Sequence, residues 1–196
     1  VTNPPIDCIR EEIVTSTSVY VGRDGNLLEE EPKNCQVLKI NNPILTNTDM
    51  LKIKNMKVEG FKAVTVPITY YKSAPLDRAM DRLFVEVDRA HRAGANILIL
   101  SDRGVDENHV AIPSLLAVSA VHQHLVKTKK RTSLAIILES GEPREVHHFA
   151  TLLGYGACAI NPYLALDTIH ELIEEGMIKK DYYCLLYTSP SPRDCS

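Results

Sequence analysis

From residue 62 onward, short apolar runs alternate with longer amphipathic stretches. The apolar runs cover residues 63–70, 96–100, 134–138 and 157–160, and each ends in polar or turn-forming residues. Short apolar runs between turn signals are typical of strands, whereas the stretches between them carry apolar residues three and four positions apart, as helices do. Strands separated by helices indicate a parallel sheet, because parallel neighbours need a crossover connection. The pattern therefore predicts four consecutive β-α units.

Proline and glycine mark the ends of the predicted helices. Pro75, Pro113 and Pro143 stand where first turns begin, and a proline there loses no intrahelical hydrogen bond. Gly94 and Gly176 follow the first and last helices, where glycine commonly ends a helix. The apolar stripes are expected at Leu115, Val118, His122 and Leu125 in the second helix and at Val146, Phe149, Ala150 and Leu153 in the third.

The chain divides into three parts by this pattern. Residues 62–183 are assigned to an α/β core, whose βαβ units would form an open parallel sheet or part of a (β/α) barrel. Residues 1–61 lack a regular period and are assigned to an irregular connector and wrapping segment that forms no core of its own. Residues 184–196 contain two Ser-Pro steps and no apolar period, so we assign them to a disordered, non-native tail.

The first 61 residues nevertheless contain local signals. Adjacent prolines near the start favour an extended connector, and residues 9–15 are compatible with a short helix. Short strands are predicted at 19–21 and 37–40. Thr46 followed by Asp49 resembles a capping box with Asp in place of Glu, which predicts a helix from there to about residue 55.

Composition narrows the class of protein. The chain has 196 residues, 44% of them hydrophobic and 24% charged, with a net charge of −3. That balance suits a globular domain and gives no indication of binding to nucleic acid or to an anionic membrane. No apolar run approaches the roughly 18 residues that span a bilayer, and we find no signal peptide. Five cysteines without paired spacing indicate free thiols in a reducing compartment.

The best candidate chemistry lies where the predicted strands end. The loop 101–103 (Ser101, Asp102, Arg103) follows the second strand, the loop 139–142 with Glu139 and Ser140 follows the third, and Asn161 and Pro162 follow the fourth. In parallel α/β sheets, ligands bind at the carboxyl ends of the strands, so these side chains are candidates for a binding or interface site. The alternative, which we favour on the residues alone, is that these are ordinary helix-capping loops.

Four histidines invite a metal site but lack the spacing for one. His122 and His124 are two positions apart, and His147 and His148 are adjacent, whereas helical zinc ligands are usually four apart. His122 falls on the apolar stripe of its helix, which favours a hydrogen-bonded histidine in the core. The sequence also lacks a phosphate loop, a C-x-x-C pair and a nucleophile elbow. We therefore assign no catalytic, cofactor-binding or metal-binding residue.

Five sequence blocks resemble one family. They read VTNPPID-x-IREEIVTS, LKI-x-NPILT, ILILSDR, IPSLLAVSAVHQHLVKT and ESGEPREVHHFATLLGYGA-x-AINPYLA. Together they resemble successive parts of the central domain of the glutamate synthase large chain, over residues 1–183. Cys8 stands where the family pattern has proline, and the tail from Cys184 departs from the family. The resemblance, with Val1 as the first residue, implies a fragment of a longer chain.

The resemblance implies a function for the longer chain. Glutamate synthase is an oxidoreductase of ammonia assimilation and glutamate biosynthesis: it transfers the amide nitrogen of glutamine to 2-oxoglutarate and reduces the product, which yields two glutamates. An amidotransferase domain releases ammonia, and an FMN-binding domain with a 3Fe-4S iron–sulfur cluster performs the reduction. Electrons come from NADH or NADPH through a small oxidising subunit or domain, or from ferredoxin. The resemblance is compatible with the cytoplasm or a plastid.

The resemblance also implies a role for this segment. In the family, the central domain lies between the amidotransferase and FMN domains, holds no flavin and helps to shape the internal passage for ammonia. The fragment alone is then expected to be inactive and to hold no cofactor, and Ser101, Asp102, Arg103, Glu139 and Ser140 become candidates for domain-interface or channel loops. The alternative is a free-standing α/β domain that binds a ligand or has a regulatory role.

Overall fold

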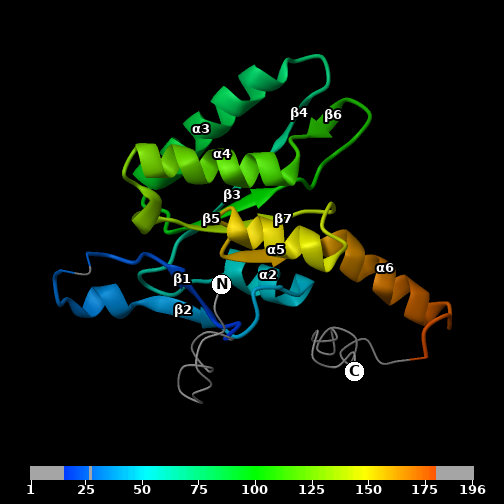
Figure 1. The fold of residues 1–196 in the computed structure, drawn as a ribbon, viewed down its shortest axis with the longest axis horizontal. Helices are drawn as coiled ribbons and strands as arrows, with labels where there is room; N and C mark the ends of the chain where they lie inside the picture. The colour runs from blue at the N-terminus through cyan, green and yellow to red at the C-terminus, as the bar shows by residue number, and fades with distance from the viewer. Residues whose placement is uncertain (1–15, 27, 180–196) are drawn as a thin grey trace, which may run out of the picture.

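The computed structural model describes residues 16–26 and 28–179. The short helix expected at 9–15 and the tail at 184–196 lie outside these residues, so both stay predictions. The described part contains a four-stranded parallel sheet with helices between its strands, which confirms the predicted α/β class (Figure 1). The strands of this sheet are β3 (Ala63–Pro67), β5 (Ile97–Ser101), β7 (Ala135–Glu139) and β8 (Ala159–Asn161), and the helices that follow them are α3 (Leu76–Arg92), α4 (Ser114–Lys127), α5 (Val146–Gly154) and α6 (Tyr163–Glu174).

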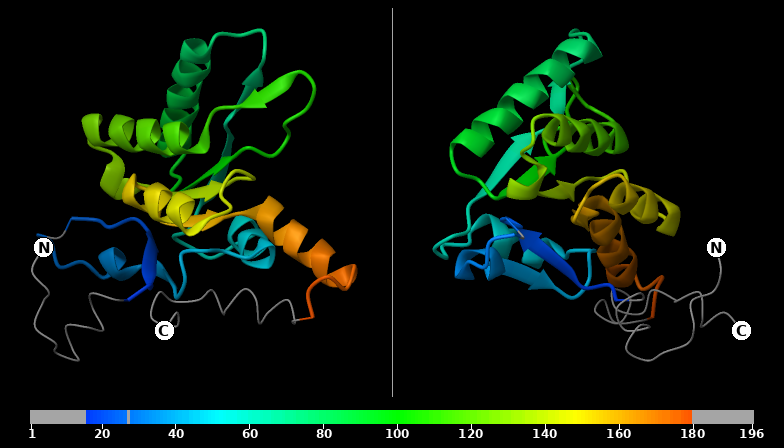
Figure 2. Two further views of the ribbon diagram at one scale, coloured as in Figure 1. Left: turned by 45° about the vertical axis from the view of Figure 1, so that its right-hand side comes forward. Right: turned by 60° about the vertical axis from the view of Figure 1, so that its left-hand side comes forward.

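The strand order is β3-β5-β7-β8, so strands that follow one another along the chain are neighbours in the sheet. This order is that of an open segment of a (β/α) barrel. Strands β5, β7 and β8 end at one side of the sheet, which we call the carboxyl edge, and α4, α5 and α6 begin there (Figure 1). Helix α6 projects away from the sheet beyond this edge (Figures 1 and 2).

The sheet is apolar on both faces. Alternate strand residues contact α3, α4 and α5 on one face, the helix face: Leu98, Leu100, Ile136, Leu138 and Ile160. The residues between them point to the opposite face, the inner face: Ile97, Ile99, Ala135, Ile137 and Ala159. All ten have exposed fractions of 3% or less. Each face therefore needs an apolar cover, because burial of apolar area is the main stabilising contribution.

The N-terminal segment, residues 16–61, covers the inner face. Its strands β1 (Val19–Gly22) and β2 (Val37–Ile40) pair antiparallel, and they lie with α2 (Asn47–Lys54) on the side of the sheet opposite to α3 and α4 (Figures 1 and 2). The segment wraps the sheet and shares a core with it. Its buried side chains join the inner-face cluster, namely Val21, Leu45, Met50 and Ile53. The boundary that we drew at residue 61 stays a prediction.

The N-terminal segment also closes one side of the sheet. Ile44 forms a parallel bridge with Ile160 of β8. The Leu45 amide donates to the Ile160 carbonyl and the Ile160 amide donates to the Pro43 carbonyl, both at 2.7 Å. The backbone groups of β8 that would otherwise accept a further strand are therefore satisfied here, which removes an exposed edge.

The apolar run predicted as one strand at 63–70 is two strands in two sheets. Strand β3 ends at Pro67, and β4 (Thr69–Tyr71) pairs antiparallel with β6 (His109–Ala111), a strand that the sequence analysis missed. Between β3 and β4, the Ile68 amide donates to the Ser101 carbonyl at 2.9 Å. Proline has no amide to donate, so a break at Pro67 loses no ladder hydrogen bond.

The helices largely begin and end as predicted. Helices α3 and α4 start directly after Pro75 and Pro113, and Gly94 and Gly176 adopt positive φ beyond the ends of α3 and α6. Helix α5 is the exception, because it begins at Val146 rather than at Pro143. The buried faces of α4 and α5 also differ from the apolar stripes that the sequence predicts. In α4 the buried apolar residues are Ala117, Val118, Val121 and Leu125, while Leu115 is exposed; in α5 the inward residues are Phe149, Leu152 and Leu153, while Val146 and Ala150 are exposed.

Candidate functional site

The residues expected at the strand ends do come together at the carboxyl edge. Ser101, Glu139 and Asn161 are cross-strand partners in the register of the sheet. By the alternation of the strands they lie on the inner face, beneath the N-terminal segment. All three are buried, with exposed fractions of 5%, 2% and 0%. Burial of polar groups is unfavourable unless each finds a hydrogen-bond partner, so their partners decide what the site can do.

Glu139 is the centre of this site. Its two carboxylate oxygens each receive a hydrogen bond from the Lys54 ammonium at 2.8 Å. The Ser101 hydroxyl donates to Oε2 at 2.6 Å, and the Arg103 Nε donates to Oε1 at 2.9 Å. Burial alone would raise the pKa of Glu139, but the hydrogen bonds from Lys54, Ser101 and Arg103 hold that pKa below its usual value. The carboxylate is therefore ionised and its acceptor sites are occupied by donors of the chain itself.

Asp102 and Ser140 form a second group that joins the loops after β5 and β7. The Ser140 hydroxyl donates to Asp102 Oδ2 at 2.6 Å, and the Gly141 amide donates to the same oxygen at 2.9 Å. The Asp102 amide donates to the Glu139 carbonyl at 3.1 Å, so a backbone hydrogen bond joins this group to the one around Glu139. Within the described residues, Asp102 Oδ1 is buried and has no hydrogen-bond partner.

Asn161 attaches the N-terminal segment to the end of β8. Its side-chain amide donates to the Leu45 carbonyl at 2.9 Å and to Asn47 Oδ1 at 3.0 Å. Asn47 in turn donates to Asp167 of α6 at 2.9 Å. Lys54 and Asn47 thus hold both ends of α2 against the carboxyl edge.

Arg103 is fixed from two sides. Besides its bond to Glu139, its guanidinium lies 3.9 Å from the centre of the Tyr163 ring, the first residue of α6. Burial and the neighbouring Asp102 carboxylate raise the pKa of Tyr163 to about 12, so the phenol is neutral. Stacking on an aromatic ring and a hydrogen bond through Nε leave an arginine little freedom to move.

This arrangement fits a structural or positioning site better than a catalytic one. The hydroxyls of Ser101 and Ser140 both donate to carboxylates, and no described histidine hydrogen-bonds either of them, so neither is arranged as an activated nucleophile. In (β/α) barrels, active sites lie at the carboxyl ends of the strands. Here the Lys54 side chain fills that position.

Sequence analysis missed two members of this site, Lys54 and Tyr163, whereas Asn161 was among the residues expected at the strand ends. Lys54 lies 85 positions before its partner Glu139, and no local pattern marks such a pair. Asn161 was expected here because it directly follows a predicted strand in the same way as Ser101 and Glu139. Tyr163 carried no polar signal, since its role is to stack on Arg103.

His122 and His148 both take part in hydrogen bonds within the chain. His122 is half-buried and its Nδ1 accepts a hydrogen bond from Arg131 Nε at 3.1 Å, which confirms the hydrogen-bonded assignment. Burial, and to a lesser extent the positive charge of Arg131, lowers the pKa of His122. His148 Nδ1 accepts from the Arg144 amide at 3.1 Å. In the part of the chain that the structure describes, no three His, Cys, Asp or Glu side chains are grouped to hold a metal ion.

The described residues offer no ligand set for the iron–sulfur cluster that the resemblance implies for the longer chain. An iron–sulfur cluster needs several thiolates together, whereas Cys35 and Cys158 belong to no ligand group in this part of the chain. That the chain binds neither FMN nor an iron–sulfur cluster stays a prediction, which the visible spectrum and the iron content of the purified chain would test.

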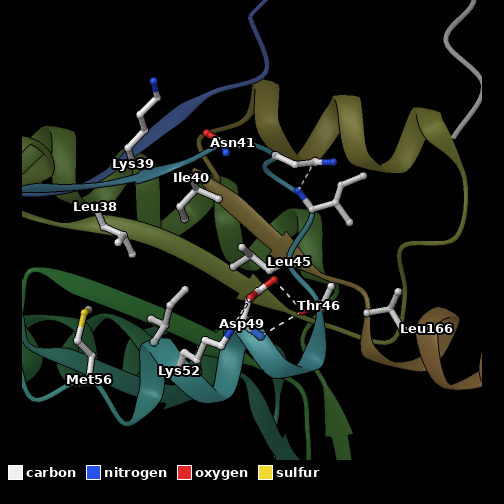
Figure 3. Close-up of a pocket in the computed structure, with 13 residues that line it drawn as sticks. Leu38, Lys39, Ile40, Asn41, Leu45, Thr46, Asp49, Lys52, Met56 and Leu166 are labelled. Carbon is white, nitrogen blue, oxygen red and sulfur yellow. Dashed lines mark hydrogen bonds and ion pairs between the residues drawn. The ribbon is translucent and has the colours of Figure 1, made fainter. Parts of the chain in front are cut away.

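A cavity of about 400 Å³ lies within the N-terminal segment, between β2 and α2 (Figure 3). It is bounded by β2, the following loop, α2 and Leu166 of α6. At its rim Thr46 and Asp49 form the predicted capping box: the Asp49 amide donates to the Thr46 hydroxyl at 3.1 Å, and that hydroxyl donates to Asp49 Oδ2 at 2.7 Å. The dashed lines in Figure 3 mark these bonds.

Comparison with known proteins identifies the class of domain. The profile of the family described as "Glutamate synthase central domain" matches residues 1–189. The large chain of NADPH glutamate synthase from Bacillus subtilis is 44% identical over 182 residues, which cover 93% of this chain and 12% of that protein. NADH glutamate synthase from Schizosaccharomyces pombe is 42% identical over 184 residues, covering 91% and 9%. A chloroplastic ferredoxin-dependent glutamate synthase from Oryza sativa is 38% identical over 175 residues, covering 87% and 11%.

This α/β domain, with its strand-end site filled from within, belongs to the glutamate synthase central domain family. The chain spans about a tenth of the length of the curated relatives it matches. The family match argues against the alternative of a free-standing ligand-binding domain. Among residues 16–26 and 28–179, none of the helices has both the length and the apolar character needed to cross a bilayer.

Proposed function

We propose that this chain serves in glutamate synthase as a non-catalytic central domain that joins the amidotransferase and FMN domains and helps to shape the passage for ammonia between them. The observation that carries the proposal is the strand-end site. Where βα proteins usually bind a ligand, this chain places its own Lys54 on Glu139. A site occupied in this way holds the shape of the domain instead of binding a substrate.

The proposal gives the domain a physical task. Ammonia that reached bulk water would be protonated, which removes the nucleophile, or lost by diffusion. A packed spacer can exclude water between two sites, and both faces of this sheet are packed with apolar side chains. We place the strand-end loops, with Ser101, Asp102, Arg103, Glu139 and Ser140, at the boundary with neighbouring domains or the passage.

The longer chain would carry out the reductive synthesis of glutamate. FMN and a 3Fe-4S cluster would belong to the FMN domain, and electrons would come from an NAD(P)H-oxidising subunit or domain, or from ferredoxin. The relatives support this range, since they include glutamate synthases named for NADPH, for NADH and for ferredoxin. Their chloroplastic members support a plastid, with the cytoplasm as the other location that we propose.

The test compares two nitrogen sources in a full-length enzyme that contains this domain. Arg103→Glu should lower glutamine-dependent synthesis on the order of tenfold, because small misplacements between sites are costly. Synthesis from free ammonia should fall less, since ammonia can reach the flavin site from solution. Arg92→Glu, an exposed arginine at the end of α3, is the matched control and should leave both rates unchanged. Equal losses with both nitrogen sources, or no loss with either, would contradict the proposed role.

A further inference from the structure

The cavity between β2 and α2 has walls that are mainly apolar. The apolar side chains that line it and are only half-buried are Leu38, Ile40, Ile44 and Met56. Of the charged residues that line it, Asp49 and Lys52 pair with each other at 3.4 Å, and Figure 3 shows the Lys39 side chain directed away from the cavity. The cavity therefore favours an apolar occupant.

The size of the cavity sets the size of that occupant. An apolar cavity of roughly 150 Å³ holds a molecule as large as benzene. This cavity measures about 400 Å³, so it has room for two aliphatic side chains. Its buried walls, among them Ile53 and Leu166, would gain further apolar contacts from such an occupant.

The first of the described residues lie beside the mouth of this cavity. Strand β1 pairs with β2 so that Val19 lies opposite Ile40. Two positions earlier, the Thr17 hydroxyl donates to the Asn41 carbonyl at 2.9 Å. Ile40 and Asn41 both line the cavity. The direction from Val19 back to Thr17 therefore follows the wall of the cavity.

The residues that precede Thr17 carry an apolar stripe of the right kind. Ile6, Ile9 and Ile13 are three and four positions apart, which places them on one side of a helix, whereas Glu11 falls on the opposite side. Isolated helices shorter than about 12 residues are marginal in water, so a short helix with this stripe needs an apolar surface to pack on.

Chain length keeps this stripe close to the cavity. Four positions separate Ile13 from Thr17, and an extended chain spans at most about 3.6 Å per residue, so their Cα atoms lie within about 14 Å of each other in any conformation. A separate partner or a second copy would lose translational and rotational freedom on binding, whereas an attached segment is already present at a high effective concentration. The attached segment is therefore favoured as the occupant.

We propose that the cavity between β2 and α2 is the docking site for residues 6–14 of this same chain, with the side chains of Ile9 and Ile13 inserted against Leu38, Ile40 and Met56. The inference goes beyond the proposed function and does not depend on it, because the cavity and its occupant belong to one chain. In the longer chain, this contact would fix the direction in which the connector approaches the cover of the inner face.

Methyl NMR of the 196-residue chain tests the contact directly. With the methyl groups of isoleucine, leucine and methionine labelled, we expect nuclear Overhauser cross-peaks from Ile13 to Leu38 and Met56, and the signal lost in Ile13→Val identifies Ile13. The absence of cross-peaks from both Ile9 and Ile13 to the residues of the cavity would overturn the proposal. Cross-peaks found only between differently labelled chains in a mixed sample would also overturn it, because they place a second copy in the cavity.

Ile13→Ser and Glu11→Ser form a matched pair on opposite sides of the predicted helix. Ile13→Ser should lower the midpoint of thermal unfolding by about 5 °C, and Glu11→Ser by no more than about 2 °C. The apolar dye anilinonaphthalene sulfonate should fluoresce more strongly with folded Ile13→Ser than with wild type, because the vacated cavity can accept it, and Glu11→Ser should match wild type. Equal midpoints for the two variants, or dye fluorescence that Ile13→Ser leaves unchanged, would contradict the docking of this segment.

Discussion

The two faces of the sheet differ where the strands end. On the helix face the last residues are apolar and fully buried, namely Leu100, Leu138 and Ile160. On the inner face the residues that end the same strands are polar and equally buried, namely Ser101, Glu139 and Asn161. Apolar packing stabilises the fold but tolerates more than one arrangement of the packed elements. A buried hydrogen bond forms only when its donor and its acceptor are placed correctly.

This difference indicates how the N-terminal segment is held on the inner face. The apolar residues of the N-terminal segment provide area, and Lys54 and Asn47 fix where α2 lies along the strand ends. A buried ion pair is weak evidence for stability, and its best-supported role is to fix one arrangement among several. We therefore interpret the Lys54–Glu139 pair as the group that places the N-terminal segment, while the contact between the helices and the helix face is made by apolar side chains.

The largest effect is expected from breaking the ion pair on one side. Lys54→Met keeps the apolar stem and leaves the buried Glu139 without its ammonium partner, so the free energy of unfolding of the 196-residue chain should fall by about 3 kcal/mol. Lys52→Met on the same helix is the control. Its ammonium is in a surface pair with Asp49, so it should change stability by about 0.5 kcal/mol or less. Urea denaturation measures the free energy of unfolding of both variants. Equal losses for Lys54→Met and Lys52→Met would show that the buried pair matters no more than the surface pair.

A slightly smaller effect is expected on the helix face. Leu138→Ala removes a fully buried side chain between the sheet and its helices and should cost about 2–3 kcal/mol of unfolding free energy. Unlike the loss at Lys54, this loss should be the same at neutral and acidic pH, because no titrating group is involved. Denaturation of Leu138→Ala and wild type at several pH values checks this, and a pH-dependent difference would contradict it.

The pH dependence of the inner face follows from Glu139. Its pKa in the folded state lies below the usual 4.5, because hydrogen bonds from Lys54, Ser101 and Arg103 outweigh the effect of burial. As the pH falls below that usual value, the unfolded chain binds the proton first, so the free energy of unfolding decreases. Glu139→Gln should lack this part of the acid sensitivity. An unchanged difference between wild type and Glu139→Gln at neutral and acidic pH would contradict the assignment.

The smallest effect concerns His122 on the helix side. Burial and the charge of Arg131 lower its pKa below the usual 6.5, so the folded state favours the neutral ring. Stability should be complete above that usual pKa and decline as the pH falls through it toward the folded pKa. His122→Gln keeps an acceptor for Arg131 and should remove this decline, which thermal unfolding on both sides of the usual pKa would detect. A decline of the same size in the variant would exclude His122 as its source.

Local sequence pattern was sufficient for most of the fold. The spacing of apolar residues predicts the four strands and the helices that follow them. Pro75 and Pro113 predict where α3 and α4 begin. Helix α5 begins late because Glu142 does not enter the helix: its carboxylate accepts a hydrogen bond from the Ser114 amide at 2.8 Å, at the start of α4. Strand β6 was missed because three residues are too few to show a period.

The sequence predicted where the candidate site lies but not which side chain of the N-terminal segment fills it. Strand ends indicated Ser101, Asp102, Arg103, Glu139 and Ser140, because the carboxyl ends of parallel strands meet at one edge. What fills the site depends on how residues 16–61 fold back over the sheet. That arrangement is set by tertiary packing on the inner face, which no local pattern encodes.

A double-mutant cycle between Lys54 and Glu139 tests the central claim most directly, because the claim is that the chain fills its own strand-end site. The free energy of unfolding is measured for Lys54→Met, Glu139→Gln, the double variant and wild type. We predict a coupling free energy of about 2 kcal/mol, so that the double variant loses little more than either single variant. Strictly additive losses would show that the two side chains do not stabilise each other, and the account of a site closed from within would be wrong.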